Sequence, residues 1–134
     1  MMKPVLIDTD ILSQFFRNHT RVLSHFREYL ANHNTISLSI ITYYEVLSGL
    51  KFRDARKQLA AFQEFVGCNT IVPLSEESIC NSANIYALLR KSGQPLDDID
   101  ILIAGVAMAN DLVPVTGNVS HFARIDGLTI QDWT

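Results

Sequence analysis

The sequence has few of the features that mark extracellular, membrane or zinc-binding proteins. Only two of its 134 residues are cysteines, and Cys68 and Cys80 lack the CxxC spacing of metal and redox motifs. Its four histidines show no ligand spacing, which argues against a zinc site. No apolar stretch is long enough to span a bilayer, and Asp8 interrupts the N-terminal apolar run too early for a signal peptide. These absences predict a soluble, cytoplasmic protein without a membrane partner, with both thiols reduced and buried.

Charged side chains are also scarce. They make up 19% of the chain, and the net charge is −3. This balance argues against a simple basic nucleic-acid binder. It remains compatible with a nuclease that meets phosphate through metal ions, because a cluster of acids lowers the net charge by itself. With 48% hydrophobic residues and no repeat or linker, residues 1–134 are expected to form one domain with a proper core.

Strand and helix patterns alternate along the chain. Strands are expected at residues 5–7, 35–39, 69–74 and 112–116, with a possible fifth, edge strand at 128–130. Helices are expected at residues 11–18, 19–33, 40–50, in a segment ending near 67, from 76 to about 92, from 98 to about 110, and briefly within 117–123. This alternation predicts an α/β fold with a mostly parallel sheet of four to five strands and helices on both faces.

Asp8 directly follows the first expected strand, Val5-Leu6-Ile7. In open α/β sheets, ligands bind where the strands end. A carboxylate buried there costs free energy unless something positive meets it. Asp8 is therefore a candidate catalytic and metal-binding residue. The simpler interpretation is that Asp8 only caps the helix that starts near Asp10.

Glu45 and Asp100 stand on expected helices whose faces are otherwise largely apolar. Asp100 shares a face with small and apolar residues, so it should point inward near the N-terminus of its helix, where the helix dipole favours an anion. Both are candidate catalytic and metal-binding acids. The simpler interpretations are that Glu45 faces solvent or a partner arginine, and that Asp97, Asp98 and Asp100 merely start a helix.

A fourth candidate segment follows the last strong strand pattern. Thr116 ends that strand and Asn118 lies in the turn after it, so both could contact water or phosphate and Asn118 could take part in catalysis. Ordinary turn chemistry explains the segment equally well. If Asp8, Glu45 and Asp100 converge, their hard oxygens suit Mg²⁺ or Mn²⁺. One or two such ions can activate water and stabilise the leaving oxygen of a phosphodiester.

Taken together, the motifs around these residues resemble the PIN-domain family, and most of all the VapC-type toxins of bacterial toxin–antitoxin pairs. The motifs are Ile7-Asp8-Thr9-Asp10, the stretch 44–49, the stretch 100–105 and the stretch 115–122, which occur in the family's order and spacing. The resemblance implies a Mg²⁺-dependent endoribonuclease that is usually homodimeric and is inhibited by a cognate antitoxin. It also implies that Asp8, Glu45 and Asp100 are the metal-binding catalytic acids.

The chain departs from the family at the position of a frequent fourth acid. Asn118 occupies one such position and His121 another. This departure concerns a second metal site rather than the fold.

Two other functions compete with this one. Asp8-Thr9-Asp10 imitates the D-x-D start of haloacid-dehalogenase-type phosphatases, but Leu12 stands where that motif has Thr or Val, and the chain is short for that fold. A non-catalytic PIN-like RNA-binding module should have lost the acids, yet three are present. The basic segment 51–57 could touch RNA, although we interpret it as a solvated helix face.

Overall fold

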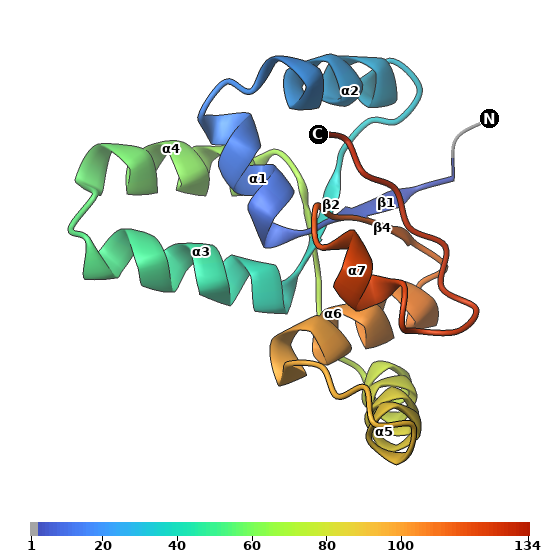
Figure 1. Ribbon diagram of the computed structural model, residues 1–134. Helices are drawn as coiled ribbons and strands as arrows, with labels where there is room; N and C mark the ends of the chain where they lie inside the picture. Colours follow the sequence, from blue (N-terminus) through green and yellow to red (C-terminus); the bar gives the residue numbers. More distant parts are fainter. Residues whose placement is uncertain (1–2) are drawn as a thin grey trace.

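The computed structural model describes residues 3–134 and has the expected α/β architecture (Figure 1). The strands are β1 (Val5–Ile7), β2 (Ser37–Ser39), β3 (Thr70–Val72) and β4 (Val113–Val115). The helices are α1 (Thr9–Phe16), α2 (Thr20–Leu30), α3 (Ile40–Phe52), α4 (Arg56–Gly67), α5 (Glu76–Lys91), α6 (Asp98–Ala109) and α7 (Val119–Phe122). No helix among the described residues is long and apolar enough to cross a membrane.

The four strands form one parallel sheet in the order β3-β2-β1-β4. β1 lies inside the sheet, where Leu6 is in register with Ser37 of β2 and with Pro114 of β4. Because all strands run the same way, their C-terminal ends meet at one edge. Asp8, the residue after β1, therefore lies at the edge where β2 and β4 also end. The parallel strand pairs confirm the expected mostly parallel sheet.

The prediction of a possible fifth strand is wrong. The segment 128–130 has no strand geometry, and Leu128 instead donates a backbone hydrogen bond to Ile125. Only Gln131 reaches the sheet, as an isolated parallel bridge to Val115. Its amide donates to the carbonyl of Pro114, and its carbonyl accepts from the amide of Thr116, both at 2.9 Å. The outer edge of β4 is thus covered by a single residue.

Each face of the sheet carries its own core. In β1, Val5 and Ile7 point into a cluster with the apolar faces of α1 to α4, while Leu6 points into a second cluster with α5, α6 and α7. Figure 1 shows the two helix groups on opposite sides of the strands. Trp133, near the C-terminus, is 1% exposed in the first cluster. Helices on both faces were expected from the alternating pattern, and this expectation is confirmed.

Short polar side chains start four of the helices. Asp8 caps α1, which begins two residues earlier than expected, and Ser39 and Ser75 cap α3 and α5. Asp97, rather than Asp98, caps α6 by accepting from the amide of Ile99. Each cap satisfies amides that the first turn of a helix leaves unpaired.

Both cysteines are free, but the expectation that they are buried is wrong. Cys68 follows α4 at the surface, and Cys80 lies on the exposed side of α5. The buried positions of α5 are Ser78, Ser82, Ile85 and Leu89, so the helix turns its small hydroxyl side chains rather than Cys80 toward α6.

Gly105 sets the distance between α5 and α6. A Cβ at this position would overlap the hydroxyl of Ser82 and the backbone carbonyl of Ser78. We therefore expect Gly105→Ala to lower the free energy of unfolding by roughly 1–3 kcal/mol, although alanine favours helices. Gly67→Ala, in α4, is the control, because nothing lies within 4 Å of its added Cβ. Urea unfolding followed by Trp133 fluorescence measures both; equal stability of the two variants would contradict the tight contact.

Candidate functional site

Asp8 is a buried carboxylate whose two oxygens are both hydrogen-bonded. It is 3% exposed. Its Oδ1 accepts from the amide of Thr9 at 2.8 Å, and its Oδ2 accepts from the hydroxyl of Thr116 at 2.8 Å. Asp8 therefore caps α1, as the simpler interpretation holds, and also faces the end of β4.

Burial raises the pKa of Asp8 from 3.8 to about 6. The hydrogen bonds from Thr116 and Thr9 lower the pKa, but they offset only part of the rise. The negative charges of Asp10 and Asp100 raise it further. No positively charged side chain among the described residues is a cause of this shift, so the hydrogen bonds that stabilise the charge of Asp8 come from neutral donors.

Asp10, which was not among the expected metal-binding residues, is a second acid at this edge. Its Oδ2 accepts from the amide of Gly117 at 2.8 Å, and its Oδ1 accepts from the amide of Ile11 at 2.9 Å. Burial is the main reason why the pKa of Asp10 is raised. A Cβ on Gly117 would lie 2.5 Å from Oδ2 of Asp10, so a larger residue at this position would displace the Asp10 carboxylate from its present contact.

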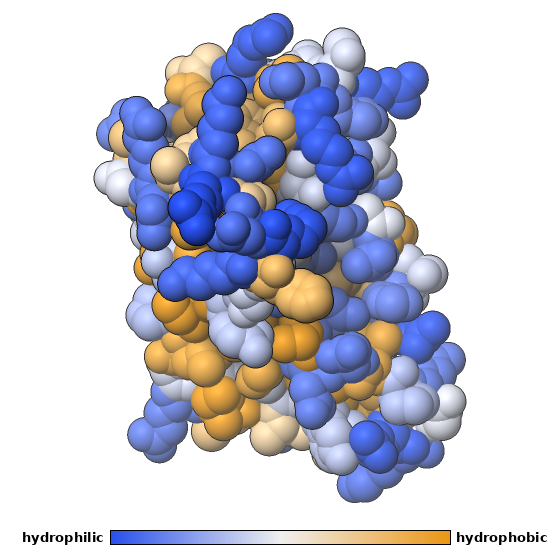
Figure 2. All heavy atoms as spheres, turned by 90° about the vertical axis from the view of Figure 1, so that its left-hand side faces the viewer, coloured by the Kyte–Doolittle hydropathy of each residue, from blue (hydrophilic) through white to orange (hydrophobic). Residues whose placement is uncertain are grey.

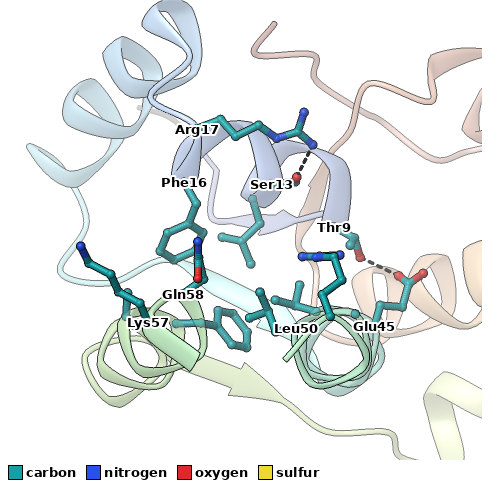
Figure 3. Close-up of a pocket in the computed structure, with 14 residues that line it drawn as sticks. Thr9, Ser13, Phe16, Arg17, Glu45, Leu50, Lys57 and Gln58 are labelled. Carbon is teal, nitrogen blue, oxygen red and sulfur yellow. Dashed lines mark hydrogen bonds between the residues drawn. The ribbon is translucent and has the colours of Figure 1, made fainter. Parts of the chain in front are cut away.

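Glu45, on α3, is half-buried and reaches α1 rather than solvent. Its Oε1 accepts from the hydroxyl of Thr9 at 2.6 Å (Figure 3). Thr9 Oγ1 also lies 3.3 Å from Oγ1 of the buried Thr42. Thr9 follows Asp8 directly, so this contact links α3 to the end of β1. Among the described residues Glu45 forms no ion pair, so the partner arginine of the simpler interpretation is absent.

Asp100 lies in the first turn of α6, with 13% of its side chain exposed. Its Oδ2 is 3.1 Å from Nδ1 of His121, which lies on α7. Its charge also acts on Asp8, as the pKa of that carboxyl shows. The inward direction expected for Asp100 is confirmed. Its histidine partner was visible in the sequence only as an unusual residue in the last motif.

Thr116 and Asn118 have different positions at this edge. Thr116 is fully buried, and its hydroxyl donates to Asp8 while accepting from the amide of Asn118 at 3.0 Å. The side chain of Asn118 is exposed and makes no capping hydrogen bond to α7. Thr116 thus positions Asp8, whereas the amide side chain of Asn118 is accessible to solvent.

The structure brings the expected acids to one edge of the sheet, but it does not assemble them as a ready set of ligands. Asp10 and Asp100 act on the charge of Asp8, and Glu45 joins the group through Thr9. Within residues 3–134, no three His, Cys, Asp or Glu side chains are placed to hold a single metal ion. The D-x-D spacing of Asp8 and Asp10 could have indicated that Asp10 also belongs to this group of acids. Nothing in the sequence indicated the contact between Thr9 and Glu45.

The raised pKa of Asp8 makes stability depend on pH. The unfolded carboxyl loses its proton near pH 3.8 and the folded one near pH 6. Between these values the folded state binds more protons, so the free energy of unfolding falls as pH rises. Asp8→Asn removes this decrease in the free energy of unfolding. Without divalent ions, the variant should therefore be more stable than wild type at pH 7 by up to roughly 3 kcal/mol. Denaturant titrations at several pH values measure it; parallel pH profiles would rule out a raised pKa at Asp8.

Comparison with known proteins agrees with this geometry. A family model described as "PIN domain" matches residues 5–128. "Ribonuclease VapC1" of Haemophilus influenzae is 29% identical over 130 residues, which cover 96% of this chain and 97% of that protein. "tRNA(fMet)-specific endonuclease VapC" of Salmonella typhimurium is 32% identical over 111 residues, which cover 81% of this chain and 84% of that protein.

A solved structure shows the same fold. The crystal structure of DNA-bound VapBC from Salmonella typhimurium has a chain that matches with a TM-score of 0.87 and 26% identity, covering 99% of this chain and 100% of that one. The family model spans nearly the whole chain, and the relatives match along most of their own length. This chain therefore belongs to the PIN-domain family, as a VapC-type member.

Proposed function

We propose that this protein is a metal-dependent endoribonuclease and the toxin of a toxin–antitoxin pair. The observation that carries the proposal is the group of acids at this edge, where Asp8 is buried and the charges of Asp10 and Asp100 raise its pKa. The relatives named as ribonuclease and as tRNA-specific endonuclease support RNA as the substrate. A phosphatase that uses Asp8 as nucleophile fits poorly, because both carboxylate oxygens are hydrogen-bonded and the residue is 3% exposed.

The donor set suits a hard divalent cation, for which we propose Mg²⁺, with Mn²⁺ as a substitute. Asp8, Glu45 and Asp100 supply carboxylate oxygens, which Mg²⁺ and Mn²⁺ prefer. Oε1 of Glu45 now accepts from Thr9, and Oδ2 of Asp100 lies near His121, so these contacts would compete with the ion. When bound, the ion supplies an activated water at neutral pH and offsets negative charge on the phosphodiester.

The protein's own residues prepare this site in distinct ways. The hydroxyl of Thr116 and the amide of Thr9 fix the carboxylate of Asp8 in one orientation. Asp100 approaches from α6, where the N-terminal dipole favours its charge. We propose that Asn118 uses its exposed amide to contact water or phosphate at the rim, with a weaker hold on a cation than a carboxylate would have.

Removing any of the three acids should abolish most RNA cleavage. We expect Asp8→Asn, Glu45→Gln and Asp100→Asn each to lower the Mg²⁺-dependent rate at least about a hundredfold, because each removes charge that holds the ion and orients water. The measurement is cleavage of a labelled RNA with and without Mg²⁺. Glu28→Gln, an exposed acid on α2, is the matched control and should cleave like wild type.

Two results would contradict this assignment. Wild-type cleavage rates in both Asp8→Asn and Asp100→Asn would remove the acids from catalysis. Hydrolysis of a small phosphate monoester by wild type, without any cleavage of RNA, would favour a phosphatase.

The same proposal includes protein partners. The solved relatives include VapBC complexes from Rickettsia felis, Salmonella typhimurium and Haemophilus influenzae, which supports a cognate antitoxin for this chain. We propose that the antitoxin brings a basic side chain to the acids and displaces the metal ion. We also propose a homodimer, consistent with exposed apolar side chains such as Phe52 and Leu88, which are 85% and 66% exposed.

Expressed alone, the chain should therefore stop the growth of a bacterial host. Asp8→Asn, produced at the same level, should permit normal growth because it removes the catalytic charge. Growth curves after induction measure the difference. If both strains grow equally well, the toxin assignment is wrong.

A further inference from the structure

A pocket of about 610 Å³ lies between α1, α3 and α4, and the Thr9–Glu45 hydrogen bond is at one end of it (Figure 3). Its floor is apolar and is formed by Leu12 and Phe16 of α1, Leu50 of α3, and Phe62 of α4. Phe16 is 39% exposed, so its ring is accessible from the pocket side as well as packed against neighbouring rings. The pocket therefore extends from Glu45, one acid of the site, into an apolar space.

Three basic side chains also line this pocket: Arg17, Arg53 and Lys57. Although the chain has 14 acids, none of the three forms an ion pair within the described residues. The guanidinium of Arg17 donates to the hydroxyl of Ser13, at 2.7 Å. Arg53 folds over Gly49, where an added Cβ would lie 3.3 Å from its Nη1. Positive charge without an internal partner is thus concentrated beside the acids of an otherwise acidic protein.

We propose that this pocket binds a nucleotide of single-stranded RNA next to the bond that is cut, with its base on the apolar floor and its phosphates at the three basic side chains. The inference rests on the proposed ribonuclease function and deepens it. Single-stranded nucleic acid alternates flat bases with charged phosphates, and proteins bind it with aromatic platforms beside basic grooves. The pocket has this combination, and Glu45 connects it to the reacting site.

The residues of the basic segment 51–57 differ in their position relative to the pocket. Arg53 and Lys57 line the pocket, whereas Arg56 lies outside it and pairs with Asp54 at 3.1 Å. Figure 2 shows this side of the molecule, where hydrophilic side chains lie beside hydrophobic patches. Arg53 and Lys57 are exposed, in keeping with a solvated face, and in addition they line the pocket.

The first test measures binding without cleavage. A fluorescently labelled, unstructured RNA is titrated with the full-length protein in buffer free of divalent ions, and anisotropy gives the affinity at several salt concentrations. Arg53→Gln and Lys57→Gln should each weaken binding several-fold and reduce the salt dependence by about 0.7 in the log–log slope. Arg56→Gln removes the same charge one residue away from Lys57 and should bind like wild type.

The second test asks whether a base enters the pocket. Phe16→Leu keeps the floor apolar but removes the ring, so it should weaken binding of the RNA about tenfold, as expected for the loss of one stacked base. Binding of an abasic RNA of the same length should not change. Urea unfolding followed by Trp133 fluorescence shows whether the variant keeps its fold, and Phe16→Tyr should restore binding.

Each outcome decides the proposal. It is supported if the Arg53 and Lys57 variants lose RNA affinity while the Arg56 variant does not, and if the effect of Phe16→Leu requires bases. It is overturned, with the ribonuclease function intact, if wild type cleaves RNA and all variants bind RNA equally. It is also overturned if the Arg53 and Lys57 variants bind RNA like wild type but bind an acidic peptide, titrated in the same way, more weakly. That result would assign the pocket to a protein partner. A wild-type protein that neither binds nor cleaves RNA would overturn both proposals.

Discussion

The burial of the Asp8 carboxylate is the constraint on which the rest of the site depends. An ionised carboxylate loses hydration when it is 3% exposed, and neutral hydrogen bonds replace only part of that loss. The two donors come from different elements: the amide of Thr9 begins α1, and the hydroxyl of Thr116 follows β4. Keeping Asp8 buried therefore requires the first helix and the last strand to stay in fixed positions.

The sheet order provides this arrangement. β1 lies directly beside β4 in a parallel sheet, so the residues after both strands emerge at the same edge, although Asp8 and Thr116 are far apart in the sequence. Asp10 makes a second connection at this edge through the amide of Gly117. Because that loop approaches so closely, a side chain larger than glycine at position 117 would displace it from Asp10. Fold and site are thus built from the same contacts.

The sequence predicted the elements well because their patterns are local. The alternation of strand and helix patterns predicts a parallel sheet with helices on both faces, and the structure has this arrangement. Asp8 could be selected because it directly follows an apolar strand, and Asp100 because it shares a helix face with small and apolar residues. The contacts of Glu45 with Thr9 and of Asp100 with His121 join distant segments, and no periodicity specifies such pairs. The prediction of a strand at 128–130 is wrong because the chain pairs with the outer edge of β4 through one isolated bridge, between Gln131 and Val115.

Binding RNA at a group of acids presents an electrostatic problem, because the substrate and the site carry the same sign of charge. A cation between them resolves this locally, but the phosphates on either side still face negative potential. Arg17, Arg53 and Lys57 surround the apolar floor next to Glu45 and lack acidic partners among the described residues, so their charge can act on a polyanion. On the proposed function, separating the acids from surface cations that lack acidic partners would let a protein with a net charge of −3 present positive charge to RNA beside Glu45.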